Sequence, residues 1–201
     1  MTTVALILFL LYIVVAFAGR AWLLRRRTGT AGWRGISGRP GSASWWGGVL
    51  FAVALVLGAA APVASLAGLD LLTDAAPLRG AGLLLFLVGA AGSLATQAAM
   101  GSAWRVGVDA QEITDLVAAG PFAIARNPFF TTLLAAAIGL ALMVPNAVAI
   151  VALLALLTAI ELQVRVVEEP YLRRTHGDAY ASYASRVGRF LPGVGRLPAA
   201  R

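Results

Sequence analysis

The stretch TVALILFLLYIVVAFAGRAWLL, residues 3–24, decides what kind of protein this chain is. Arg20 is its only charged residue, and a helix of 22 residues is about 33 Å long, which is enough to cross a bilayer. A cleaved signal peptide carries its positive charge before the apolar run, whereas here Arg25, Arg26 and Arg27 follow it. The sequence therefore predicts a retained first span with its N-terminus outside the cell.

The composition around that stretch indicates the same class of protein. Of the 201 residues, 60% are hydrophobic and only 12% are charged, with a mean hydropathy of +0.84. A soluble domain carries about 25% charged residues. The net charge is +7 and all 16 basic residues are arginine. In a membrane protein an excess of arginine indicates topology rather than a nucleic-acid partner.

The residue types that are missing exclude several chemistries. The chain has no Cys, no Lys and a single His, His176. This excludes thiol nucleophiles, cysteine-ligated metals, Schiff-base lysines and a multi-histidine metal site within one chain. We therefore expect no metal.

Four further apolar runs follow the first, at about 45–67, 78–100, 129–143 and 147–166. The loop Arg25–Ser44 has five arginines and no acid, so it belongs in the cytoplasm. Pro145 and Asn146 are turn residues, so the last two runs are interpreted as an antiparallel hairpin with a short first leg. The sequence predicts an all-α polytopic membrane protein with about five transmembrane helices and a cytoplasmic C-terminal segment.

Polar residues gather in two segments, 101–128 and 161–192, which the alternation of spans places on the same side of the membrane. In the first, the spacing from Asp109 to Glu112 is that of a capping box and predicts a short interfacial helix. Pro128 restricts the residue before it to extended backbone, so we expect a helix to begin at Pro128 itself.

The second polar segment begins within a helix. Its first polar residues recur at intervals of three and four, which predicts that the charged ones share one face: Glu161, Arg165, Glu168 and Glu169. Such a face is either functional, as ionisable groups at a membrane usually are, or a solvated, mutually paired stripe. In either case we expect one of the adjacent glutamates to pair with Arg165.

Two motif blocks carry a resemblance to a known family. The first is Gly120-Pro121-Phe122 followed by Arg126-Asn127-Pro128-Phe129, which resembles the signature G-P-Y-x-x-x-R-H-P-x-Y. The second comprises Glu168-Glu169-x-x-Leu172, Gly177-x-x-Tyr180-x-x-Tyr183 and Arg189-Phe190-x-Pro192. Together, and in this order after the hydrophobic spans, they are similar to the isoprenylcysteine carboxyl methyltransferase and phospholipid methyltransferase superfamily of integral membrane enzymes.

The resemblance implies an S-adenosylmethionine-dependent methyltransferase whose lipophilic or lipid-attached substrate arrives from the bilayer. It divides the chain into three spans with a basic loop, 1–100, and a cofactor-binding region, 101–201, within one structural domain. The implied cofactor-binding residues come from both blocks: Val117, Gly120, Pro121, Phe122, Arg126, Asn127, Pro128, Glu168, Glu169, Leu172, Tyr180 and Tyr183.

The chemistry of the cofactor assigns roles within this set. Its ammonium group needs an acid, which Glu168 or Glu169 supplies, and its sulfonium suits the aromatic rings of Tyr180 or Tyr183. We expect Arg126 to hold an anionic group and Glu169 to act as the base if the nucleophile is an amine or a thiol. Methyl transfer from a sulfonium needs neither a metal nor a covalent enzyme intermediate.

Three residues depart from the family pattern. Asn127 stands where the family has His, Phe129 replaces a Tyr, and His176 precedes Gly177 in place of an aromatic residue. An amide still donates and accepts hydrogen bonds, so Asn127 keeps part of the function of the ring. His176 and Gly177 are typical of a helix C-terminus.

Two other functions fit the sequence. One is a membrane sterol or steroid reductase that uses NADPH, because such enzymes end in comparable Tyr-rich and Arg-rich segments. The other is a non-catalytic lipid-binding protein of the same fold. The richness in Ala, Gly and Arg is typical of bacteria, so we expect the bacterial cytoplasmic membrane, with the site on the cytoplasmic side.

Overall fold

The computed structural model describes residues 1–29, 35–100 and 116–198, and within these ranges the chain is helical without a β-strand. Two π-helical turns, η1 and η4, each continue the helices on either side of them, and η3 is a 3-10 turn. The elements are α1 (Thr2–Ile13), η1 (Val14–Gly19), α2 (Arg20–Thr28), α3 (Ala43–Leu66), α4 (Ala76–Met100), η3 (Gly120–Ala123), α5 (Pro128–Met143), α6 (Ala147–Leu162), η4 (Gln163–Glu168) and α7 (Glu169–Arg186).

Among the described residues, four helices are long and apolar enough to cross a membrane: Thr2–Arg26, Ala43–Leu66, Ala76–Met100 and Ala147–Arg186. This confirms an all-α protein with several potential spans. Helix α5 is also apolar but has only 16 residues, so a fifth span stays a prediction, and so does the orientation of the N-terminus. The first helix runs on to Thr28, past the loop start predicted at Arg25, because the first helix-ending residue is Gly29 with φ 79°.

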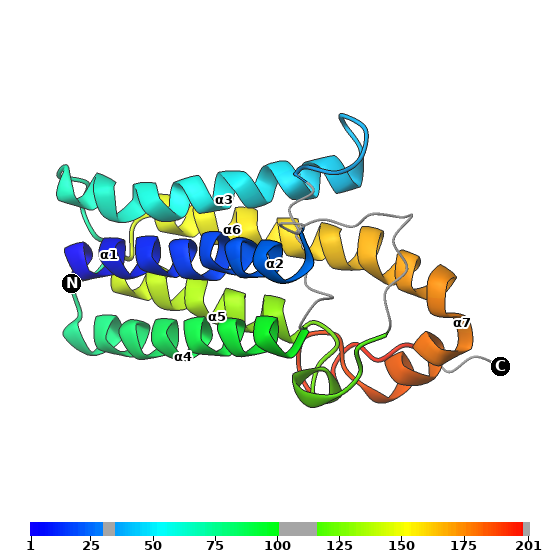
Figure 1. The fold of residues 1–201 in the computed structure, drawn as a ribbon. Coiled ribbons are helices and arrows are strands. Elements are labelled where there is room, and N and C mark those ends of the chain that lie inside the picture. Colours follow the sequence, from blue (N-terminus) through cyan, green and yellow to red (C-terminus); the bar gives the residue numbers. More distant parts are fainter. Residues whose placement is uncertain (30–34, 101–115, 199–201) are drawn as a thin grey trace.

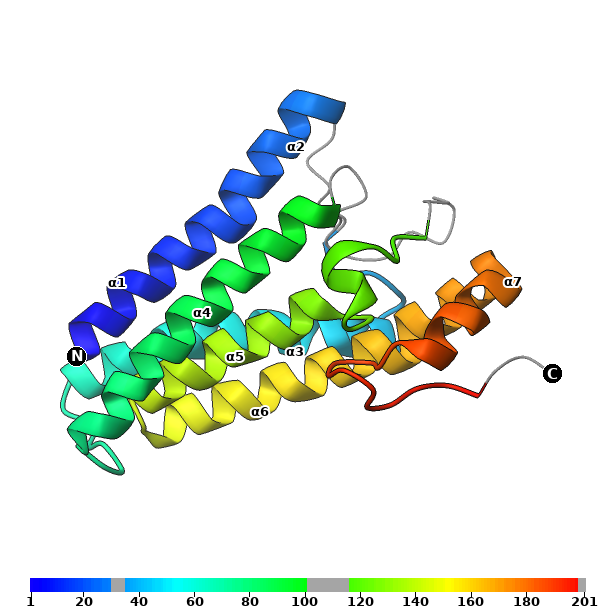
Figure 2. The same ribbon diagram turned by 90° about the horizontal axis from the view of Figure 1, so that it is seen from below.

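The helices associate chiefly as two pairs, α4 with α5 and α3 with α6 (Figure 2). Glycines allow the close approach of the first pair. A Cβ on Gly89 would lie 2.3 Å from the backbone nitrogen of Ala136, and one on Gly139 would lie 2.3 Å from that of Phe86. The small residues of the 78–100 segment therefore serve the close packing of α4 against α5.

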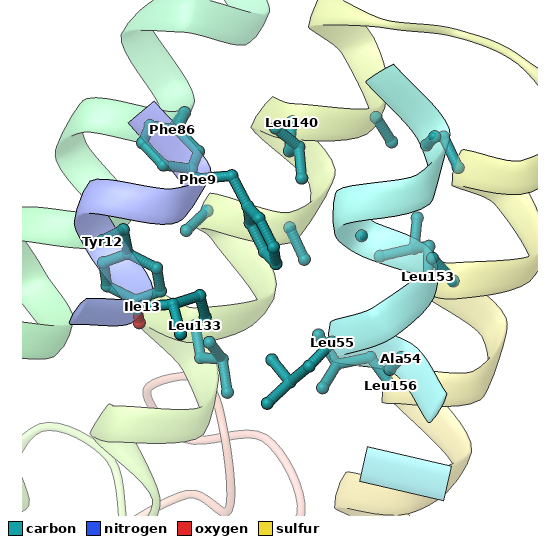
Figure 3. Close-up of a pocket in the computed structure, with 17 residues that line it drawn as sticks. Phe9, Tyr12, Ile13, Ala54, Leu55, Phe86, Leu133, Leu140, Leu153 and Leu156 are labelled. Carbon is teal, nitrogen blue, oxygen red and sulfur yellow. The ribbon is translucent and has the colours of Figure 1, made fainter. Parts of the chain in front are cut away.

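Helix α1 packs against α3 and α5 and is tied to α4 by buried polar groups. The hydroxyls of Tyr12 and Ser93 lie 2.9 Å apart, and Gln97 Nε2 donates to the carbonyl of Ala16, in the π turn, at 3.0 Å. Residues of α1, α3, α4, α5 and α6 surround a small cavity of about 50 Å³, lined almost wholly by carbon atoms (Figure 3). A cavity of this kind stays dry because water would find no polar partners in it.

The two ends of the bundle differ in chemistry (Figure 1). At one end lie the N-terminus, the α3–α4 connection and the α5–α6 turn. Asn146 caps α6 there by accepting from the backbone nitrogen of Ala149, and its amide donates to the Ala61 carbonyl, which confirms the turn predicted at this position. The other end gathers the described parts of both polar segments, as predicted.

Candidate functional site

The site begins with a pairing of two segments that are distant in the sequence. The turn that follows η3 lies parallel to the chain after α7, with a β-bridge between Ala125 and Gly188. The backbone nitrogen of Arg126 donates to the Gly188 carbonyl at 2.8 Å, and that of Asn127 donates to the Arg189 carbonyl at 3.0 Å. The two motif blocks therefore meet, as the sequence predicted for one shared site.

Arg126 is the centre of this meeting point, with its side chain 2% exposed. Its Nη1 donates to the carbonyls of Ala184 and Val187 at 3.0 and 2.6 Å. Its Nη2 donates to Glu169 Oε1 at 2.7 Å and to the Gly195 carbonyl at 3.1 Å. Its Nε is buried and has no hydrogen-bond partner among the described residues.

Glu169 is buried and binds a second arginine, which the sequence analysis did not assign to the site. Arg189 donates from Nε to Glu169 Oε1 at 2.8 Å and from Nη2 to Oε2 at 2.9 Å. These bonds to the carboxylate raise the pKa of Arg189. The signal for Arg189 was its place in the second motif block. Both carboxylate oxygens of Glu169 therefore accept hydrogen bonds from arginines. We call Arg126, Glu169 and Arg189 together the arginine clamp.

The chain reaches the clamp because it reverses within α7. At Gly177 the backbone has φ 48° and ψ −123°, which breaks the helix and confirms the predicted helix end. In Figure 2 the segment after this break runs back toward the bundle. It returns Tyr180 and Tyr183, both buried, with ring centroids 6.2 Å apart. The Tyr183 hydroxyl donates to the Phe122 carbonyl at 2.6 Å, so this tyrosine also joins the two blocks.

Glu168 faces a different neighbour from Glu169. Its Oε1 accepts a hydrogen bond from Gln163 Nε2 at 3.1 Å. The prediction that a member of this pair binds Arg165 is wrong, because Arg165 pairs with Glu161. The reason is the π-helical turn η4, which widens the helix at Gln163–Glu168 and breaks the single charged face that regular α-helical spacing predicts.

The remaining predicted residues lie around this core. Gly120 has φ 60° at the start of η3, and Leu172 packs against the two buried tyrosines. Asn127 has φ −124° and ψ 58° and donates from Nδ2 to the Arg189 carbonyl, and α5 begins at Pro128 as predicted. Val117, Pro121 and Phe122 lie in the same turn region, of which Phe122 is buried. The capping box predicted at 109–112 lies outside the described residues.

The arrangement separates two kinds of group. The clamp holds the two blocks together, and its charges are largely satisfied internally. Glu168 has a side-chain hydrogen bond to one of its two carboxylate oxygens, and Arg126 Nε has no partner among the described residues. A carboxylate suits the ammonium group of an amino-acid ligand, and a guanidinium suits its carboxylate.

Comparison with known families agrees with this geometry. Residues 78–179 match the model of the phospholipid methyltransferase family, a match that covers half of the chain and includes α4, α5 and α6. No curated protein gives a significant match. The matched region also contains Arg126, Glu168 and Glu169, the polar residues around which the site is built. The chain therefore belongs to the phospholipid methyltransferase family of membrane proteins.

Proposed function

We propose that this protein transfers a methyl group from S-adenosylmethionine to a lipophilic or lipid-attached nucleophile at the polar end of its helix bundle. The observation that carries the proposal is the direct contact of the two motif blocks, Arg126 to Glu169 at 2.7 Å, within a chain of a methyltransferase family. The three-span region 1–100 and the cofactor region 101–201 then act as one unit in the membrane.

The side chains present fit such a cofactor. Glu168 has one hydrogen bond to one carboxylate oxygen, so it can accept from the cofactor's ammonium group. Arg126 Nε is a buried donor without a partner among the described residues, which keeps the predicted anion-binding role of Arg126 in the proposal. When bound, S-adenosylmethionine supplies an electrophilic methyl group on a sulfonium, and the rings of Tyr180 and Tyr183 offer the aromatic surroundings that such a cation prefers.

The two glutamates have different roles in this proposal. Both carboxylate oxygens of Glu169 accept hydrogen bonds from arginines, so we propose that Glu169 positions the two blocks and holds Arg126 in place. Glu168, its neighbour, is the better candidate for contact with cofactor or nucleophile. This refines the expectation that Glu169 itself is the base.

The bilayer determines the class of substrate and its route. The site lies at the end of membrane-length helices, so a substrate with a hydrocarbon tail reaches it without leaving the membrane. Arg25, Arg26 and Arg39, which precede α3, lie at the same end, which favours the cytoplasmic side for the site. A carboxylate, amine or thiol on such a lipid is a suitable methyl acceptor.

The proposal is tested with the purified protein, S-adenosylmethionine labelled in its methyl group, and a total lipid extract. We expect label in the lipid fraction, and thermal stabilisation by S-adenosylmethionine or S-adenosylhomocysteine but not by NADPH. The variant Glu168→Gln should lose most of the stabilisation while it remains folded. Stabilisation by NADPH alone would indicate a reductase, and the absence of any cofactor binding by the folded protein would refute the proposal.

A further inference from the structure

Where the structure describes their side chains, the exposed arginines lie at one end of the bundle. Among the described residues, the arginines with exposed side chains are Arg25, Arg26, Arg39, Arg165, Arg173, Arg174, Arg186 and Arg196. They come from α2, the α2–α3 connection, η4, α7 and the segment after α7, which share the end that holds the site (Figure 1). At the opposite end the described charged side chains are Arg79, which is largely buried, and the exposed acids Asp70 and Asp74.

Most of these guanidiniums have no counter-ion in the ranges that the structure describes. Of the eight, Arg165 pairs with Glu161, and Arg26 lies over the ring of Trp22 at 4.0 Å. For the other six, no ion pair or side-chain hydrogen bond joins them to the described part of the chain. The one exposed acid among the described residues of this end is Asp178. The surface therefore presents strong positive charge that the described part of the chain does not neutralise.

The position of this surface identifies its partner. The arginines follow directly on helices of membrane length, so they lie where the phosphates of a bilayer are found. Exposed Trp22 and Trp46 mark the same level, and indole rings are enriched at that interface. A guanidinium also binds phosphate oxygens in a bidentate manner. A soluble polyanion such as a nucleic acid would need to reach the same surface past the lipid headgroups.

We propose that this set of eight arginines, the arginine collar, binds anionic phospholipids and gathers them around the site end of the protein. Each arginine near an anionic membrane surface strengthens the attraction of a basic protein segment to that surface by about fivefold. The inference concerns the lipids that surround the protein, and it does not depend on which reaction the site catalyses.

The collar is tested in vesicles of phosphatidylcholine that contain the reconstituted full-length protein and a trace of spin-labelled lipid. Electron paramagnetic resonance measures the fraction of labelled lipid that the protein immobilises, and hence the relative association constant of phosphatidylglycerol against phosphatidylcholine. We expect a ratio above about two at low salt, which falls toward one as added salt screens the charges.

Two variants on α7 test the residues. Arg173 and Arg174 are exposed and make no side-chain bond to the described chain, so Arg173→Gln with Arg174→Gln should fold normally and lower the ratio. Asp178→Asn, on the same helix, should raise it, because it removes the exposed acid. Equal association of the two lipids with the unaltered protein, or a ratio that neither variant changes, would overturn the proposal. Its failure would leave the methyl-transfer experiment unaffected.

Discussion

The adjacent glutamates Glu168 and Glu169 have different partners, so their replacement should have different consequences. We predict that Glu169→Gln destabilises the protein severely, whereas Glu168→Gln does so only slightly. Glu169 is the counter-ion of Arg126, whose side chain is 2% exposed, and of Arg189, whose side chain is 14% exposed. The amide of Gln carries no charge, so both guanidiniums would lose their neutralising partner.

The magnitude follows from the burial. Removing one partner of a buried ion pair costs about 3–5 kcal/mol, because it leaves an uncompensated charge in the interior. Arg126 meets that condition, and Arg189, whose side chain is also largely buried, adds to the loss. Glu168 is half-buried and has one side-chain hydrogen bond, to Gln163, so its replacement by Gln should cost about 0.5–1.5 kcal/mol.

The assay is reversible unfolding of the two variants in mixed micelles of a mild detergent and sodium dodecyl sulfate, followed by circular dichroism. Cofactor binding by whatever fraction is folded is measured alongside. We expect Glu169→Gln to lose stability and Glu168→Gln to lose cofactor affinity at nearly unchanged stability. Equal and small losses of stability in both variants would show that the arginine clamp does not hold the two blocks together.

Three further predictions use the same unfolding measurement. Gly89→Ala should cost about 1–3 kcal/mol, because its Cβ would meet the backbone of α5, whereas Gly80→Ala, which meets nothing within 4 Å, should not destabilise. Asn146→Ala should cost about 1–3 kcal/mol, since it removes a helix cap and leaves the buried Ala61 carbonyl without its side-chain donor. Tyr183→Phe should cost about 1 kcal/mol, because it removes the hydrogen bond from the Tyr183 hydroxyl to the Phe122 carbonyl in η3. Limited proteolysis should then cleave the chain near η3 faster, and an unchanged cleavage pattern would contradict this.

Local physics made most of the fold predictable from the sequence. Length and hydropathy placed the long apolar helices, because a bilayer-spanning helix needs about 20 apolar residues in a row. Pro128, the Pro145–Asn146 turn and Gly177 fixed helix ends through backbone restrictions that act within a few residues. The two polar patches could be assigned to one side because each further span reverses the direction of the chain.

The tertiary structure decided how the charges are shared. The π-helical turn at Gln163–Glu168 rotates the following residues relative to α-helical spacing, so Glu169 turns to Arg126, while Arg165 forms an i,i+4 pair with Glu161. Arg189 entered the site only because the chain after α7 folds back against the η3 turn. Such pairings join residues 20 and 43 positions apart, and no local rule encodes them. The sequence alone thus determined the helices and the set of reactive residues, and the long-range packing determined which of them are bound to one another and which remain available for a ligand.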